Sequence, residues 1–96
     1  MAAETPLDQD LSVPETLAMV SRKVMGKVLR DKRRERGLTQ EEAAQLLGRS
    51  RASLYRTESG DRRVPVSDLP AFALAYGCTA AWFLEETQRR LDERTR

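Results

Sequence analysis

Residues 37–60 read GLTQEEAAQLLGRSRASLYRTESG and contain the start and stop signals of two consecutive short helices. Thr39 is a favoured N-cap residue, and Glu42 three positions later can bond back to the N–H of the cap, which makes a capping box. Gly48 can adopt the left-handed conformation that ends a helix. These signals predict a short first helix between Thr39 and Gly48. Its apolar face is expected to consist of Ala43, Ala44, Leu46 and Leu47.

The second helix of this stretch is expected to follow Ser50 as its cap and to end at Gly60. Helical spacing divides its residues between two sides. One side carries Leu54, Thr57 and Glu58. The opposite side carries Arg51, Ala52, Tyr55, Arg56 and Ser59. Two short helices joined by a glycine-containing turn are typical of a helix-turn-helix, whose second helix enters the major groove of DNA.

A wider pattern of residues surrounds this motif at fixed spacing: Arg33, the run Gly37 to Glu42, Ala44, Leu47, Gly48, Ser50, Glu58, Gly60 and Pro65. In this pattern the chain resembles the Cro/lambda-repressor-like (XRE-type) family of bacterial and phage DNA-binding domains, over about residues 22–86. Many positions at fixed spacing are more specific than one short motif. The resemblance implies an all-α fold, a compact five-helix lambda-repressor-like domain with an N-terminal arm and a helical extension.

The composition argues against several other classes of protein. Histidine is absent and Cys78 is the only cysteine, which excludes disulfide frameworks, Cys/His zinc sites and histidine-based catalysis. No nucleophile has a candidate base at motif spacing, so we expect neither an enzyme nor a cofactor. We expect Cys78 to be buried and inert, because no basic neighbour is expected to lower its pKa.

The expected location follows from the same composition. No apolar run approaches the length of a membrane span, and the N-terminus is acidic where a signal peptide would be basic. We therefore expect a cytoplasmic protein without a membrane partner. The family resemblance implies that it is bacterial or phage-encoded and associated with the nucleoid when bound to DNA.

Charge divides the N-terminal third of the chain. Residues 1–21 contain four acidic residues and no basic one, whereas residues 22–36 contain eight basic residues and two acidic ones. We expect residues 1–13 to form a flexible acidic arm and residues 14–96 to form the helix-turn-helix domain. A basic run alone usually indicates a solvated helix face, but beside a helix-turn-helix it favours neutralisation of DNA phosphates.

Apolar residues recur at helical spacing before the motif, at Leu17, Val20, Val24, Val28 and Leu29. One long helix can therefore start at Pro14, with Ser12 as a nearby cap, and extend to Gly37. Gly26 marks a candidate kink. Residues 14–22 extend beyond the first helix of the family. This extension either packs back on its own domain or provides a surface for a dimer or another partner.

Two further helices are expected after the motif. Ser67 or Asp68 can cap a fourth helix, which Gly77 ends, and Thr79 can cap a fifth. Residues 85–96 alternate in charge and contain a single leucine. The last turns of the fifth helix are therefore expected to fray in solvent.

Side-chain chemistry and the family resemblance together predict the residues that contact DNA. Arginine can contact guanine through two hydrogen bonds, and alanine can touch a thymine methyl group. The predicted base-reading residues are Arg51, Ala52, Tyr55 and Arg56. The predicted phosphate contacts are Gln40, Arg49, Ser50, Ser53, Arg62 and Arg63. Arg33 and Glu58 match an ion pair of the family that holds the recognition helix to its scaffold.

Two functions remain open from the sequence. One recognition helix reads only a few base pairs, so a transcriptional regulator would act as a symmetric homodimer on an inverted-repeat operator. The simplest form is a repressor, although the residues do not distinguish repression from activation. The alternative is an antitoxin-like or adaptor protein, in which the arm and residues 14–25 bind a protein partner and DNA binding is secondary.

Overall fold

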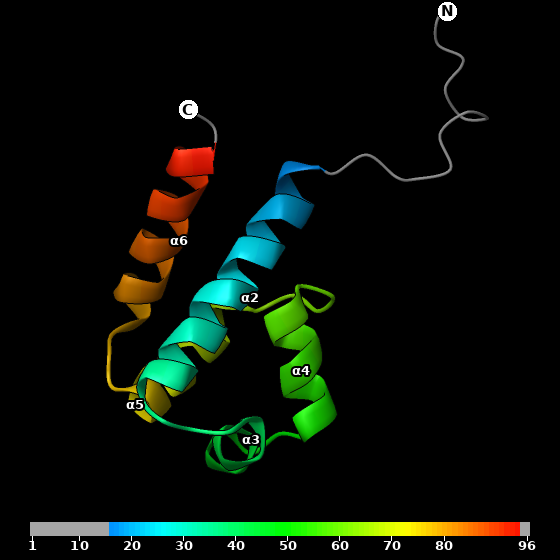
Figure 1. Cartoon of the computed structure of the whole chain (residues 1–96), viewed down its shortest axis with the longest axis vertical. Coiled ribbons are helices and arrows are strands. Elements are labelled where there is room, and N and C mark those ends of the chain that lie inside the picture. The colour runs from blue at the N-terminus through cyan, green and yellow to red at the C-terminus, as the bar shows by residue number, and fades with distance from the viewer. Residues whose placement is uncertain (1–15, 95–96) are drawn as a thin grey trace, which may run out of the picture.

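A computed structural model of the chain describes residues 16–94 (Figure 1). Within this range the structure is α-helical and contains no strand. The five predicted helices are present. In chain order the elements are α2 Leu17–Glu35, α3 Gln40–Leu47, α4 Arg51–Ser59, the 3-10 turn η2 Val66–Asp68, α5 Leu69–Tyr76 and α6 Ala80–Arg94. The predicted acidic arm, residues 1–13, lies outside the described residues, as do Ser12 and Pro14.

The local signals of the helix-turn-helix form the expected caps. The Thr39 hydroxyl accepts a hydrogen bond of 3.1 Å from the Glu42 N–H, and the Glu42 carboxylate accepts one of 2.9 Å from the Thr39 N–H. Gly48 ends α3 at φ 70°, and Gly60 ends α4 at φ 87°. Ser50 caps α4 through its side chain. The predicted bounds of both helices are therefore confirmed.

The first helix begins later than the sequence suggested. Thr16 caps α2, which starts at Leu17 rather than at Pro14 and continues to Glu35. Within the extension Val20 packs against the core, whereas Leu17 stays 86% exposed. The extension thus packs partly on its own domain and leaves an apolar side chain in solvent at its start.

Gly26 lies inside α2, which is one continuous helix, and its role is close packing rather than the predicted kink. A Cβ atom at Gly26 would lie 2.5 Å from the carbonyl oxygen of Glu58. A Cβ atom at Gly60 would likewise lie 2.9 Å from the Cα atom of Lys23. The two glycines therefore allow α2 to cross the C-terminal end of α4 at short distance, which fixes the position of α4 (Figure 1).

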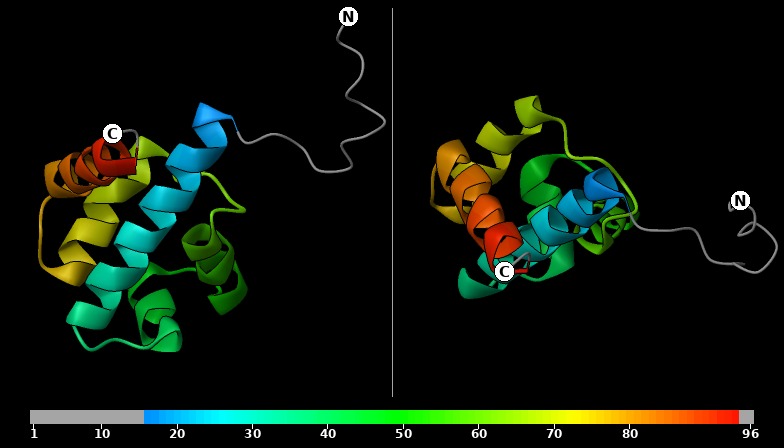
Figure 2. Two further views of the ribbon diagram at one scale, coloured as in Figure 1. Left: turned by 45° about the horizontal axis from the view of Figure 1, so that its top comes forward. Right: turned by 90° about the horizontal axis from the view of Figure 1, so that it is seen from above.

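The core lies where α2 passes between α4 and α6 (Figures 1 and 2). Phe72, Tyr76 and Phe83 fill its centre, with successive ring centroids 5.8 and 6.4 Å apart in edge-to-face arrangements. Such pairs stabilise a core beyond the burial of their area. Leu46 does not belong to this core: it is 63% exposed, so its assignment to the apolar face of α3 is wrong. The other predicted residues do form this face: Ala43 and Ala44 are buried, and Leu47 packs against the core.

The last turns of α6 pack along α2, and the predicted fraying is not observed up to Arg94. Arg90 donates hydrogen bonds of 2.9 Å to Asp31 on α2 and of 2.8 Å to Glu86 on its own helix. Leu91 packs against the core. The alternating charges thus pair within α6 and across to α2, which holds these turns.

Cys78 is partly buried between charged neighbours. Burial raises the pKa of its thiol, Glu35 adds to this effect, and Lys32 and Arg36 oppose it. The expectation that no basic residue acts on the thiol is therefore wrong. Burial outweighs both cations, and a thiol with a raised pKa is a poor nucleophile at neutral pH.

Candidate nucleic-acid interface

The exposed side of α4 carries the predicted base-reading residues. All four of them are exposed, and Tyr55 keeps 59% of its surface in solvent. The opposite side is buried: Leu54 is fully enclosed, and Thr57 is 1% exposed. Within the part of the chain that the structure describes, the side chains of Arg51 and Arg56 make no hydrogen bond or ion pair. Both guanidinium groups are therefore available to an external ligand.

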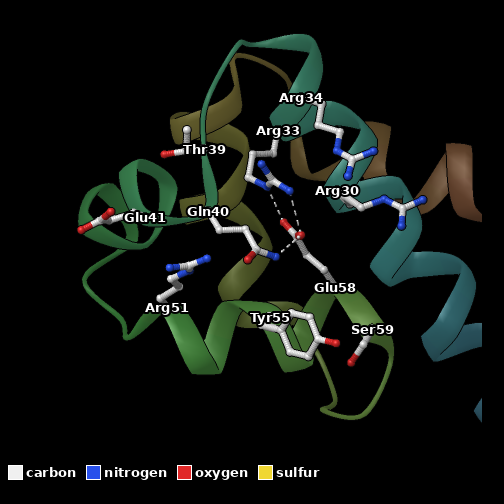
Figure 3. A pocket seen from close by; sticks show the side chains of 10 residues that line it. All are labelled: Arg30, Arg33, Arg34, Thr39, Gln40, Glu41, Arg51, Tyr55, Glu58 and Ser59. Carbon is white, nitrogen blue, oxygen red and sulfur yellow. Dashed lines mark hydrogen bonds and ion pairs between the residues drawn. The ribbon is translucent and has the colours of Figure 1, made fainter.

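An ion pair between α2 and α4 holds this helix in place. Arg33 Nε donates a hydrogen bond of 2.7 Å to Glu58 Oε2, and Nη2 donates one of 3.1 Å to Oε1 (Figure 3). The hydrogen bond to Glu58 raises the pKa of Arg33 against the opposing effect of burial. Arg33 also donates to the carbonyl of Leu38, and Gln40 donates a bond of 3.0 Å to Glu58. These bonds satisfy a pair whose burial would otherwise cost free energy.

The N-terminal end of α3 combines free backbone N–H groups with two acidic side chains, Glu41 and Glu42. The amide side chain of Gln40 faces Glu58, so it is turned toward the ion pair in this structure. Its backbone N–H and that of Glu41 stand in the first turn of α3, where helix geometry leaves N–H groups without a partner in the helix. Such groups, together with the helix dipole, favour a phosphate oxygen.

Arg49 contacts α5 in this structure. Its guanidinium pairs with Asp68 at 3.1 Å and lies over the ring of Phe72, 5.0 Å from the centroid. These contacts connect the turn between α3 and α4 to α5. They indicate a structural role for Arg49, whose predicted phosphate contact stays a prediction.

Ser53 is buried, contrary to the accessibility that a phosphate contact needs. It is 7% exposed, and its hydroxyl accepts a hydrogen bond of 2.9 Å from Arg62 Nη1. The backbone N–H of Arg62 also bonds to the Arg56 carbonyl at 3.2 Å. Ser53 thus holds the side chain of Arg62 against α4. Arg63, next in the loop, is exposed and has no hydrogen bond or ion pair among the described residues.

A hollow beside α4 brings together residues that the sequence placed far apart. It lies between α2, α3 and α4, with the Arg33–Glu58 pair in its floor (Figure 3). Its lining residues are Arg30, Arg33, Arg34, Thr39, Gln40, Glu41, Arg51, Tyr55, Glu58 and Ser59. The sequence did not single out Arg30 and Arg34. Their spacing from Arg33 was the available signal, because residues three and four apart share a helix face.

The rest of the basic run is distributed over other surfaces. Lys32 lies over the ring of Trp82, 4.7 Å from its centroid, and pairs with Glu35 at 3.2 Å. Lys27 lines a separate groove between α2 and α6 with Arg90. The run therefore does not form one continuous face for DNA, and only part of it lies near α4.

Residues 16–94 contain neither a candidate metal site nor a candidate membrane-spanning helix. No group of three or more histidine, cysteine, aspartate or glutamate residues there could hold a metal ion. None of the helices in this range has both the length and the apolar character that crossing a bilayer requires.

Comparison with known proteins places this geometry in a family. Residues 24–82 match the family model of a helix-turn-helix domain. The chain is similar to the clp gene regulator ClgR from Corynebacterium glutamicum, with a TM-score of 0.74 and 28% identity over 85% of this chain and 84% of that one. It is also similar to a hypothetical transcription factor, NHTF, from Neisseria, with a TM-score of 0.66 and 28% identity over 86% of this chain and 98% of that one.

A further solved structure is an HTH_3 family transcriptional regulator from Vibrio cholerae, with a TM-score of 0.65 and 25% identity over 74% of this chain and 40% of the other. The search of curated proteins gave no match. The family model, however, covers more than half of the chain. This protein therefore belongs to the helix-turn-helix domain family, in agreement with its resemblance to Cro/lambda-repressor-like (XRE-type) domains.

Proposed function

We propose that this chain is a sequence-specific, double-stranded DNA-binding transcriptional regulator that places α4 in the major groove. One observation carries the proposal: α4 presents the guanidinium groups of Arg51 and Arg56 to solvent without a hydrogen bond or ion pair in the described chain, while Glu58 anchors its opposite side. A helix held rigidly by one face and carrying hydrogen-bond donors on the other suits base reading. The similarity to a clp gene regulator and to a hypothetical transcription factor supports the same function.

The roles within the interface follow from the contacts. Arg51 and Arg56 would each bind O6 and N7 of a guanine, Ala52 would meet a thymine methyl group, and Tyr55 would reach an adjacent base edge. Gln40 and Ser50 would contact phosphate at the starts of α3 and α4. Arg62 and Arg63, in the loop that follows α4, would contact the phosphates of the DNA strand opposite the one that Gln40 and Ser50 contact. For Arg49 and Ser53 we favour support of the interface over direct contact with phosphate.

The assembly that we propose is a homodimer on an inverted repeat. The whole of α4 is only nine residues long, Arg51–Ser59, so its exposed side reads too few base pairs for a unique genomic site. Two copies related by a dyad would double the recognised sequence, with half-sites about 34 Å apart. The simplest function of such a dimer is repression, in which the bound dimer blocks RNA polymerase. It would act at the nucleoid, in the cytoplasm.

Binding to duplex DNA at several salt concentrations tests this function. A protein that neutralises about 6 to 10 phosphates should lose roughly 10³- to 10⁵-fold in affinity between 50 and 200 mM salt. The measurement is fluorescence anisotropy with a labelled duplex, and the matching single strand serves as a comparison. A weak, salt-insensitive interaction, or a preference for the single strand, would contradict the proposal.

A second function, binding of a protein partner, is favoured by one feature of α2. Leu17 is 86% exposed at the start of this helix, next to the acidic residues that precede it in sequence. Deletion of residues 1–13 separates the two functions. If the arm serves a partner, operator affinity stays unchanged while partner binding is lost. If the arm acts on DNA binding or dimerisation, operator affinity itself changes.

A further inference from the structure

The hollow beside α4 is lined by two arginines of α2, Arg30 and Arg34, that have no role in the proposed reading of bases. Arg30 and Arg34 lie about one turn apart on α2, and they line the hollow together with Arg51 and Tyr55 of α4. Figure 3 shows the two α2 arginines across the hollow from Tyr55, with Glu58 between the helices. The hollow is therefore a surface shared by the recognition helix and α2.

The acidic residues of the hollow do not neutralise it. Glu58 is paired with Arg33 through two hydrogen bonds, so its charge is already balanced. Glu41 is exposed in the first turn of α3. Against this one carboxylate stand three more arginines, Arg30, Arg34 and Arg51. The hollow thus has an excess of positive charge.

The two α2 arginines are weakly engaged by the protein. Arg30 Nε lies 3.7 Å from Asp31, beyond hydrogen-bond distance, and Asp31 already accepts a bond of 2.9 Å from Arg90. The Arg34 side chain is exposed and makes no hydrogen bond or ion pair with any other described residue. Both guanidinium groups can therefore bind an anion without breaking a strong contact.

The position of the hollow beside α4 indicates which strand of DNA would supply the anions that bind there. Arg51, Tyr55 and Ser59 recur every four residues and form the edge of α4 that borders the hollow. The opposite edge is formed by Ala52 and Arg56, the latter bonded through its carbonyl to the following loop. A helix in the major groove has one sugar-phosphate strand on each side. The strand on the first edge would pass over the hollow.

We propose that Arg30 and Arg34 bind the phosphates of the DNA strand that passes the hollow, opposite the strand contacted by Arg62 and Arg63. Four residues of helix advance about 6 Å, so the two guanidinium groups can contact neighbouring phosphates of one strand. This inference rests on the proposed function, because it requires α4 to occupy the major groove. It adds two α2 residues to the contacts with the strand opposite Arg62 and Arg63.

The test compares arginine variants with a matched lysine variant on the same helix. Arg30→Ala and Arg34→Ala remove charge from the hollow, whereas Lys27→Ala removes one charge from the groove against α6. Affinity is measured across a range of salt concentrations for a random-sequence duplex and for an operator obtained by selecting bound duplexes from a random DNA pool. Each arginine variant should flatten the slope of log affinity against log salt by about one unit and weaken both duplexes roughly five- to tenfold at 0.1 M salt. Lys27→Ala should keep the wild-type slope.

The outcomes separate this inference from the function on which it rests. If the wild-type protein shows a steep salt dependence but the arginine variants match Lys27→Ala, then Arg30 and Arg34 do not bind phosphates. The proposed function still stands in that case. If the wild-type protein itself does not bind duplex DNA, both fail. Arg34→Lys, which keeps the charge, should retain the slope, so a loss shared by Arg34→Lys would also overturn the proposal. Phosphate ethylation interference should show Arg34→Ala losing contacts on one strand only.

Discussion

Arg33 and Glu58 lie 25 positions apart in the sequence, and in the fold two hydrogen bonds of 2.7 and 3.1 Å join them. Their side chains are only 7% and 3% exposed. The pair connects the longest helix of the domain to the helix that carries the proposed base readers. It therefore fixes the orientation of α4 and of its exposed side.

Removal of one charge from this pair should destabilise the protein strongly. Glu58→Gln leaves the Arg33 guanidinium buried without its counter-charge, so the free energy of unfolding should fall by about 3 kcal/mol. Urea denaturation followed by circular dichroism measures this value. Glu41→Gln, at an exposed site in α3, is the control and should change stability by no more than about 0.5 kcal/mol. Equal effects of the two variants would show that the buried pair does not hold α4.

Gly26→Ala should destabilise the protein even though alanine favours helix. The added Cβ would lie 2.5 Å from a backbone oxygen of Glu58, so α2 and α4 would have to separate. Overpacking of this kind costs about 1 to 3 kcal/mol, against a gain in helix propensity of about 1 kcal/mol. The free energy of unfolding of the variant shows which of the two effects is larger. A variant more stable than the wild type would contradict the close crossing of α2 and α4.

Arg49→Ala should act on stability rather than on phosphate binding. It removes the pair with Asp68 and the contact with the Phe72 ring, which together should cost about 1 kcal/mol. The slope of affinity against salt should stay as in the wild type. A variant that melts normally but loses about one unit of slope would instead support the phosphate contact that the sequence predicted.

Arg56→Ala and Arg63→Ala should weaken DNA binding in different ways. Loss of Arg56 should cost about 1 to 3 kcal/mol on the selected operator and relax the preference at one base position. Loss of Arg63 should weaken all sequences alike and flatten the salt slope by about one unit. Competition binding with single-base operator variants distinguishes the two effects. Identical behaviour of the variants would contradict the division between base reading and phosphate contact.

The helix-turn-helix could be predicted because its signals are local. Thr39, Gly48, Ser50 and Gly60 act within a few residues of themselves, so the bounds of α3 and α4 follow from the sequence. The exposed and buried sides of α4 also followed, because helical periodicity alone assigns them.

The inward-facing polar residues could not be predicted in the same way. The buried Ser53 hydroxyl accepts a hydrogen bond from Arg62, and Arg49 contacts Asp68 in η2 and Phe72 in α5. Both contacts depend on how segments distant in sequence meet. The need for glycine at position 26 likewise depends on the helix crossing, which no pattern within α2 reveals.

Whether α4 reads a specific sequence in duplex DNA is decided by selection of bound duplexes from a random pool at near-physiological salt. We expect enrichment of an inverted repeat, with guanines at matching positions of half-sites whose centres lie about 34 Å apart. Recovery of a pool without any enriched sequence, from protein shown to be folded, would contradict it.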